Sequence, residues 1–215
     1  MRRTLFASPL ILLVLILFAS RTGAQTTLIP FGKHSTWRYQ DDGQPLAPDW
    51  IEPKFDDSNW KSGTAPLGYG EADISTTLSF GSAPQQKTIT ARFRHSFQIP
   101  DAGQLKQLVF MIRSDDGCVV YLNGKEILRH NLPQGQITAD TRALKRSDGL
   151  EERLYQYFKV DADQLVSGAN VIAIEVHQVD PRSSDLFLDL ALRGYPDDDS
   201  LRPSNNIWIS LIPRN

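Results

Sequence analysis

Two adjacent aspartates followed by a glycine are the clearest candidates for chemistry in this chain. Asp115, Asp116 and Gly117 stand between two segments rich in apolar residues, so the chain is expected to turn sharply there. Their carboxylates are hard oxygen ligands of the kind that Ca²⁺ prefers, and they could also accept hydrogen bonds from sugar hydroxyls. The alternative is structural, because aspartates commonly cap a tight turn that glycine makes accessible. The pattern favours the turn.

A calcium site would need more oxygen ligands than this turn supplies, since calcium takes about six to eight. The acidic residues considered as further ligands are Glu71, Glu175 and Asp185. Together with Asp115 and Asp116 they form the candidate calcium set. Calcium is expected only as an optional structural ion, and the sequence predicts no required cofactor.

A second group of polar side chains is expected on the outer face of a sheet. In residues 171–178 (VIAIEVHQ), apolar side chains alternate with Glu175 and His177, which should therefore point away from the core, toward solvent or a polar groove. Arg94 stands in the same way within residues 88–99. A ligand groove built from Arg94, Glu175 and His177 is one hypothesis. The alternative is cross-strand pairing of arginine with glutamate, worth about 0.2–1 kcal/mol if exposed.

The polar segment from His177 to Asp185 (HQVDPRSSD) ends a predicted strand, which is a common position for a binding site in a sandwich. Asp185 is therefore also a candidate for ligand binding. Sugar sites usually add an aromatic platform, for which Trp37, Trp50 and Tyr69 are candidates. The alternative for all three is burial as anchors of irregular loops.

The sequence contains no recognisable catalytic motif. Its four histidines do not form HExxH or another metal-ligand cluster, and there is no GxSxG, P-loop or GxGxxG. Cys118 is the single cysteine, which excludes an intrachain disulfide and is expected to be a small buried residue. Catalytic residues are therefore predicted as none, although scattered carboxylates could still pair in space as glycosidases require.

The N-terminus has the order of a secretory signal peptide. Arg2 and Arg3 precede an apolar run of ten residues (LILLVLILFA), and small residues end at Ala24. Because a bilayer-spanning helix needs about 20 apolar residues, cleavage after Ala24 and a secreted or periplasmic location are expected, with no membrane span remaining. Removing residues 1–24 takes away three arginines and changes the net charge from −2 to −5, which argues against a nucleic-acid partner.

The elements that position these residues are predicted to be short strands. Apolar residues alternate with polar ones, or form short runs, in segments separated by Gly, Pro, Asn and Asp; these segments are 88–99, 105–113, 118–122, 125–129, 155–160, 171–178 and 186–192. Asn123-Gly124 predicts a hairpin, and residues 161–168 look like one helical turn. Residues 41–82 are expected to be irregular. The predicted fold is an all-β sandwich over residues 25–195, with residues 196–215 as a tail or edge strand.

Several local strings resemble the galactose-binding-like jelly-roll modules of secreted bacterial proteins. The strings are FDDSNW (55–60), PLGYGE (66–71), SDDG (114–117), VYLNGK (120–125), GANVIAIEVHQ (168–178) and SSDL (183–186). Some also look like the non-catalytic sugar-binding domain of family-2 glycoside hydrolases. Their order over about residues 30–195 is similar to a module appended to some secreted metallophosphoesterases and spore-coat-type proteins. The resemblance implies a jelly-roll fold.

The resemblance also implies a function without catalysis. The leading hypothesis is an exported binding module for carbohydrate or envelope glycan. The alternative is a structural module that docks onto a secreted enzyme such as a metallophosphoesterase, and the third hypothesis is a hydrolase. Convergence of three or more Asp, Glu or His side chains in one cleft would favour the hydrolase.

Overall fold

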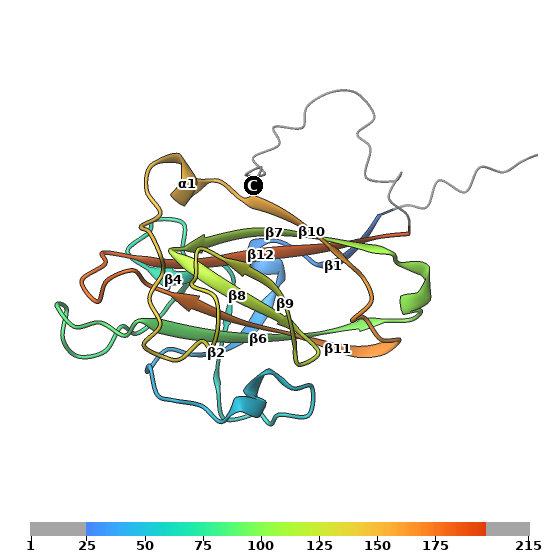
Figure 1. Ribbon diagram of the computed structural model, residues 1–215, viewed down its shortest axis with the longest axis horizontal. Helices are drawn as coiled ribbons and strands as arrows, with labels where there is room; N and C mark the ends of the chain where they lie inside the picture. The colour runs from blue at the N-terminus through green and yellow to red at the C-terminus, as the bar shows by residue number, and fades with distance from the viewer. Residues whose placement is uncertain (1–24, 197–215) are drawn as a thin grey trace, which may run out of the picture.

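The computed structural model describes residues 25–196, which form a sandwich of two antiparallel-dominated sheets (Figure 1). Sheet A has the strand order β10-β7-β12-β4-β5, and β1 pairs with the remaining edge of β12. Its strands are β1 (Thr26–Ile29), β4 (Leu67–Tyr69), β5 (Thr76–Thr77), β7 (Gln107–Asp115), β10 (Gln156–Asp161) and β12 (Leu186–Tyr195). The all-β sandwich predicted from the alternating pattern, and the jelly-roll class that the resemblance implies, are therefore confirmed.

Sheet B has the strand order β3-β2-β6-β11-β8-β9. Its strands are β2 (Thr36–Gln40), β3 (Lys61–Thr64), β6 (Thr90–Ile99), β8 (Gly117–Leu122), β9 (Lys125–His130) and β11 (Gly168–His177). The helical elements of the described residues are short: η1 (Gly32–His34), η2 (Pro48–Ile51), η3 (Ala102–Gln104) and α1 (Leu150–Arg153). None of the helices in residues 25–196 is long and apolar enough to cross a bilayer.

The core lies between the sheets and is built from the apolar faces that the sequence predicts. Strands β6 and β11 contribute Phe93 and Ile174 from sheet B, and β7 and β12 contribute Phe110 and Leu190 from sheet A; all four are fully buried. Because side chains of a strand alternate between its faces, most of the alternate residues of these strands enter this one core.

The turns explain where the strands end. Asn123 and Gly124 both have positive φ (52° and 87°) between β8 and β9, so the predicted two-residue hairpin is confirmed. The helical turn expected at 161–168 is wrong: the chain instead makes a hydrogen-bonded turn from the Leu165 N–H to the Ala162 carbonyl. Strands β3, β4 and β5 lie in the stretch expected to be irregular, where each is four residues or shorter.

Two loops cover the outer face of sheet B. One contains η2, which lies against β6 and β8 on the side away from sheet A (Figure 1), and its Trp50 packs edge-on against Tyr121 of β8 with ring centroids 5.8 Å apart. The other, residues 131–147, packs Leu132 and Ala143 on Val119. The signal peptide predicted for residues 1–24 and the tail or edge strand predicted for 196–215 lie outside the described residues, apart from residue 196.

Candidate functional site

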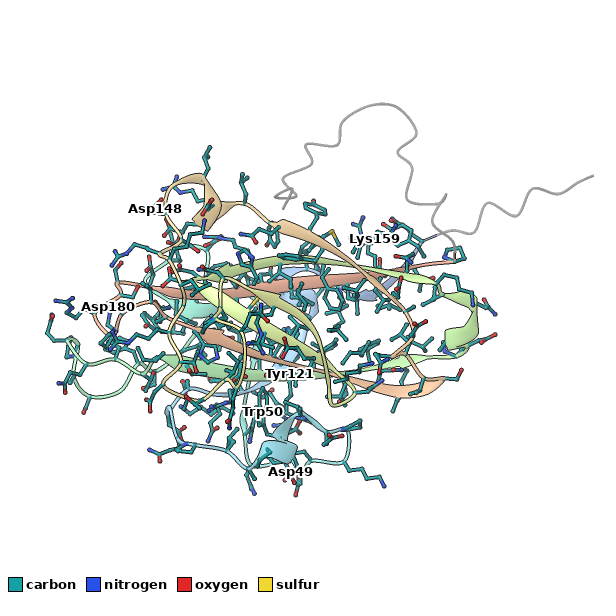
Figure 2. The ribbon with its side chains drawn as sticks, in the orientation of Figure 1. Asp49, Trp50, Tyr121, Asp148, Lys159 and Asp180 are labelled. Carbon is teal, nitrogen blue, oxygen red and sulfur yellow. The ribbon has the colours of Figure 1, made fainter. Side chains whose placement is uncertain are left out.

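A pocket lined mainly by acidic and hydroxyl side chains lies at the end of the sandwich where β7 stops and β12 begins. It is formed by residues 115–116, 146–148, 152 and 183–185, and is called the acidic pocket below. In Figure 2, Asp148 and Asp180 mark this end of the molecule. Its volume of about 190 Å³ is smaller than the roughly 300–1,000 Å³ of typical small-molecule pockets, so it can enclose an ion with water but not a whole sugar.

Three carboxylates converge at the edge of this pocket, where Glu152 and Asp185 line it and Glu71 lies next to them. Oxygens of Glu71, Glu152 and Asp185 all lie within 4.8 Å of one another, and each side chain is half-buried. Glu71 is also paired with the Arg113 guanidinium at 3.3 Å. Burial, followed by the nearby carboxylates of Asp185 and Glu71, raises the pKa of Glu152. This acidic group could hold a metal ion, since mutual repulsion between its members would be relieved by a cation.

Asp115 lies deeper in the same pocket. It is 3% exposed, and its Oδ1 atom is buried without a hydrogen-bond partner. Burial, and then the carboxylates of Asp116 and Asp185, raises the pKa of Asp115 to about 10. The buried Tyr69 hydroxyl also lacks a partner. Burial first, and then the charges of Asp185, Asp115 and Asp116, raises the pKa of Tyr69.

Asp116 has a different role from its neighbour. One carboxylate oxygen accepts from the Ser147 N–H at 2.7 Å and the other accepts from the Val179 N–H at 2.8 Å. Its backbone carbonyl accepts from the Ser147 hydroxyl and the Asn131 amide. Asp116 therefore fixes two loops at the turn, as the structural interpretation of the Asp-Asp-Gly string expects.

Close backbone packing brings Asp185 to the pocket. A Cβ atom at Gly70, whose φ is +86°, would lie only 2.6 Å from the Ser184 carbonyl oxygen and 2.7 Å from the Asp185 Cα. Only glycine fits at position 70, for two reasons. An L-residue would be strained at this φ, and its Cβ atom would collide with the backbone of residues 184–185. The contact sets the segment after β4, which carries Glu71, against the segment before β12, which carries Asp185.

Arg94, Glu175 and His177 lie elsewhere, on the outer face of sheet B. They point away from the core as expected, but the expectation of solvent or an open polar groove is wrong, because the loops of η2 and residues 131–147 bury all three. Arg94 donates to the Asp57 carboxylate at 2.8 Å and to the carbonyl oxygens of Trp50 and Glu52. Its partners hold the η2 loop against the sheet.

Glu175 is the centre of a buried polar network rather than part of the acidic pocket. It accepts from the Tyr121 hydroxyl at 2.8 Å, and its carboxylate lies 3.6 Å from Arg92 and 3.4 Å from His177. Burial would raise the pKa of Glu175, but the contacts to His177, Tyr121 and Arg92 outweigh it and hold that pKa below its usual value. The candidate calcium set is therefore split: Glu71, Asp115, Asp116 and Asp185 lie together, and Glu175 does not join them.

The aromatic residues considered for a sugar platform are buried. Trp37, Trp50 and Tyr69 are each less than a tenth exposed, so all three are buried as the alternative expected. Only Trp50 anchors a loop, because Trp37 lies in β2 and Tyr69 in β4, where both join the core. Trp60 remains half-buried and stacks on Trp50, with ring centroids 6.2 Å apart. Cys118 is fully buried, and burial raises the pKa of its thiol to about 11, which removes the thiolate needed for nucleophilic chemistry.

Glu152 is a pocket residue that the sequence did not indicate, as are the pocket residues 146–148. It belongs to α1, which is only four residues long, and it follows Glu151 in a polar segment with no periodicity. Its place beside Asp185 depends on how the loop after β9 returns over the sandwich, and no local pattern encodes that path.

The convergence of three carboxylates meets the condition set for the hydrolase hypothesis, but their spacing does not suit one. Glycosidase carboxyl pairs stand about 5–5.5 Å or 6.5–9.5 Å apart, so that the bond to be cleaved lies between them. Here one oxygen of each carboxylate lies within 4.8 Å of one oxygen of each of the others, so three acids meet at one point instead of forming a pair on opposite sides of a bond. The group is better suited to binding a cation.

Comparison with solved structures shows which fold the chain shares. A β-glucuronidase of Bacteroides uniformis matches with a TM-score of 0.52 and 14% identity, over 80% of this chain and 18% of that one. A calcium-binding mutant of β-glucuronidase 2 from the same organism matches with a TM-score of 0.50 and 16% identity, over 80% and 18%. A β-glucuronidase of an uncultured Clostridium sp. matches with a TM-score of 0.50 and 16% identity, over 81% and 30%.

No protein-family profile matches the chain, and no curated protein does. The resemblance to modules appended to metallophosphoesterases therefore stays a prediction. The chain spans less than a third of the β-glucuronidases that it matches, so their activity is not carried over to it. At these identities the likeness concerns fold alone: the chain is similar to a β-sandwich region of family-2 glycoside hydrolases.

Proposed function

We propose that this protein is an exported, non-catalytic binding module whose ligand is carbohydrate or envelope glycan, bound at the rim of the acidic pocket. The observation that carries the proposal is the set of incompletely paired carboxylates that one end of the sandwich presents. Carboxylates are strong acceptors for hydroxyl donors, so Asp185 and its neighbours suit the edge of a sugar ring. The pocket volume supports contact at a chain end or ring edge rather than full enclosure.

Calcium is the ion that the proposal assigns to Glu71, Glu152 and Asp185. All three supply hard oxygen ligands, and none of the group is a nitrogen or sulfur donor of the kind that favours zinc. In this proposal the ion stabilises the binding end of the module and takes no part in a reaction. The binding of the glycan and the binding of the ion are separate claims.

A glycan-array screen of the exported protein tests the carbohydrate claim. We expect binding to a limited group of glycans that falls at least tenfold in the Asp185→Asn variant. The matched control is Asp180→Asn, which changes an aspartate of the same β11–β12 loop that pairs with Arg182 outside the pocket. Absence of binding across the array, with and without calcium, would refute it. Export is tested by N-terminal sequencing of the extracytoplasmic protein, which should begin at Gln25.

A second candidate function is docking onto a secreted enzyme, such as a metallophosphoesterase encoded separately. It is favoured by the large exposed apolar side chains of residues 144–157, the stretch that also contributes residues 146–148 and 152 to the acidic pocket; these side chains are Leu144, Leu150, Leu154 and Tyr157. Apolar surface gathered in one segment is typical of a protein interface. A Leu150→Ser/Leu154→Ser variant should then lose co-elution with that enzyme while its melting temperature stays unchanged. Unchanged co-elution would reject docking through this segment.

A further inference from the structure

One edge of β10 has no partner strand within the part of the chain that the structure describes. β10 pairs with β7 over six residues, from Gln156 opposite Ile112 to Asp161 opposite Gln107, and with no other strand of residues 25–196. This pairing has no bulge, and β10 contains no proline. Its second edge therefore presents backbone N–H and C=O groups that a further strand could bind.

The core is open along this edge. Phe158 and Val160 of β10 point into the sandwich, next to Phe110 and Leu108 of β7. The two β7 side chains are fully buried, whereas Phe158 and Val160 are only half-buried. A strand added to β10 would remove more of their apolar surface from water, which favours its binding.

The chain itself contains a segment that suits this edge. Residues 207–212 (IWISLI), which lie beyond the described residues, are apolar at five positions of six. In an extended segment, alternate side chains point to opposite faces. One face of such a strand would carry only Ile207, Ile209 and Leu211, as a strand over the open core requires.

The length of chain between the sandwich and this segment is sufficient. Tyr195, the last residue of β12, lies opposite Gln107 of β7, which lies opposite Asp161 of β10. The free edge of β10 is therefore three strand spacings from Tyr195, or about 14–15 Å. Residues 196–206 are eleven residues, which can span up to about 36–40 Å. The segment can reach β10 after a turn.

The direction of the strands favours β10 over the other edges of sheet A. A strand that returns from the end of β12 runs opposite to β12, and so is antiparallel to β10. Beside β1 it would be parallel, which is slightly less stable per residue, and β1 has only four residues. β5 has two residues, and it pairs with β4 near the start of β12 rather than its end.

We propose that residues 207–212 bind the free edge of β10 as an antiparallel strand of sheet A, with Ile209 beside Val160 and Leu211 beside Phe158. The same register sets Ile212 beside Tyr157 on the outer face of the sheet. The added strand closes the open side of the core and prevents this edge from pairing with another chain. The inference is independent of the proposed function, because neither the glycan nor the ion takes part in it.

The first experiment tests the position by disulfide cross-linking of the dilute, exported protein under mild oxidation. We expect the Tyr157→Cys/Ile212→Cys variant to form an intramolecular disulfide in at least fivefold higher yield than Ser62→Cys/Ile212→Cys. Ser62 is the matched control, because it is exposed on β3 at an edge of the other sheet. The natural Cys118 is buried and should not compete.

Equal yields in the two cysteine pairs would overturn the inference. A disulfide that joins two chains instead of closing within one would also overturn it, and would assign the β10 edge to a second copy of the protein.

The second experiment follows hydrogen exchange of the β10 amides that point away from β7. Ile209→Asp would set a charge against Val160 and the core, so their exchange should become at least tenfold faster. Ser210→Asp is the matched control, because it adds the same charge on the outer face; exchange should stay within twofold of the wild type. Circular dichroism checks that both variants remain folded. Unchanged exchange in Ile209→Asp, or an equal increase in Ser210→Asp, would contradict the proposed strand.

Discussion

Asp115 and Asp116 are adjacent acids for which the structure predicts stability losses of different size from the same substitution. Asp116 is 1% exposed and accepts from the Ser147 and Val179 amides. In Asp116→Asn, the amide oxygen can still accept from one of these two backbone N–H groups. The NH₂ group then faces the second N–H, so two donors meet and that hydrogen bond is lost. Hydrogen bonds to a charged group contribute about 1.5–3 kcal/mol each, and an unpaired buried group costs about 1–3 kcal/mol. We therefore expect a loss of about 2–4 kcal/mol in the free energy of unfolding.

The neighbouring variant is the comparison. Asp115→Asn removes no hydrogen bond at Oδ1, because that atom has no partner. Without calcium we expect its stability to change by less than about 1 kcal/mol. Both variants are measured by urea denaturation in the presence of chelator, where the midpoint should move and the slope should not. For a domain of this size, the loss in Asp116→Asn corresponds to about 4–16 °C in melting temperature.

Equal effects of the two substitutions would refute this assignment of roles. So would a larger loss in Asp115→Asn than in Asp116→Asn, because the oxygen without a partner would then be the one that holds the turn. A change of slope in either variant would mean that the substitution alters the extent of unfolding rather than one set of bonds.

Three further outcomes follow from the fold. Arg94→Met should cost about 3–5 kcal/mol of unfolding free energy, since it leaves Asp57 and two backbone carbonyls without their donor; urea denaturation measures it. Leu190→Ala should cost about 2–5 kcal/mol by the same assay, because Leu190 is fully buried between the sheets. Burial lowers the pKa values of His95 and His130, so the folded state binds fewer protons than the unfolded state; stability should be complete above about pH 6.5 and fall as the pH drops toward 5, less steeply in His95→Gln. A melting temperature that is flat over this range would contradict it.

The long strands were predictable because their sequences carry the pattern that burial imposes. In β6, β7, β11 and β12, most side chains at the core-facing alternate positions are apolar, and that signal is local. Strands β4 and β5 are three and two residues long, too short for an alternation to register. Their pairing with each other and with β12 is set by tertiary packing.

The burial of the polar side chains was harder to predict than the strands, because it depends on tertiary structure. The alternation correctly predicted that Arg94, Glu175 and His177 point away from the core, but it could not show that loops cover that face of the sheet. Whether the outer face of sheet B is covered depends on the three-dimensional paths of the η2 loop and of residues 131–147. The same limit applies to the acidic pocket: Glu71, Asp115 and Asp185 were recognisable as acids beside turns, while Glu152 entered only through the path of α1.

The two ends of the described chain leave the sandwich together. Thr26 of β1 lies opposite Gly194 of β12, whereas Asp185 stands at the other end of β12, about 30 Å away for a strand of ten residues. Figure 2 shows Asp148 at that far end. A stalk, neighbouring domain or surface joined to the described ends would therefore attach to the sandwich at the end opposite the acidic pocket.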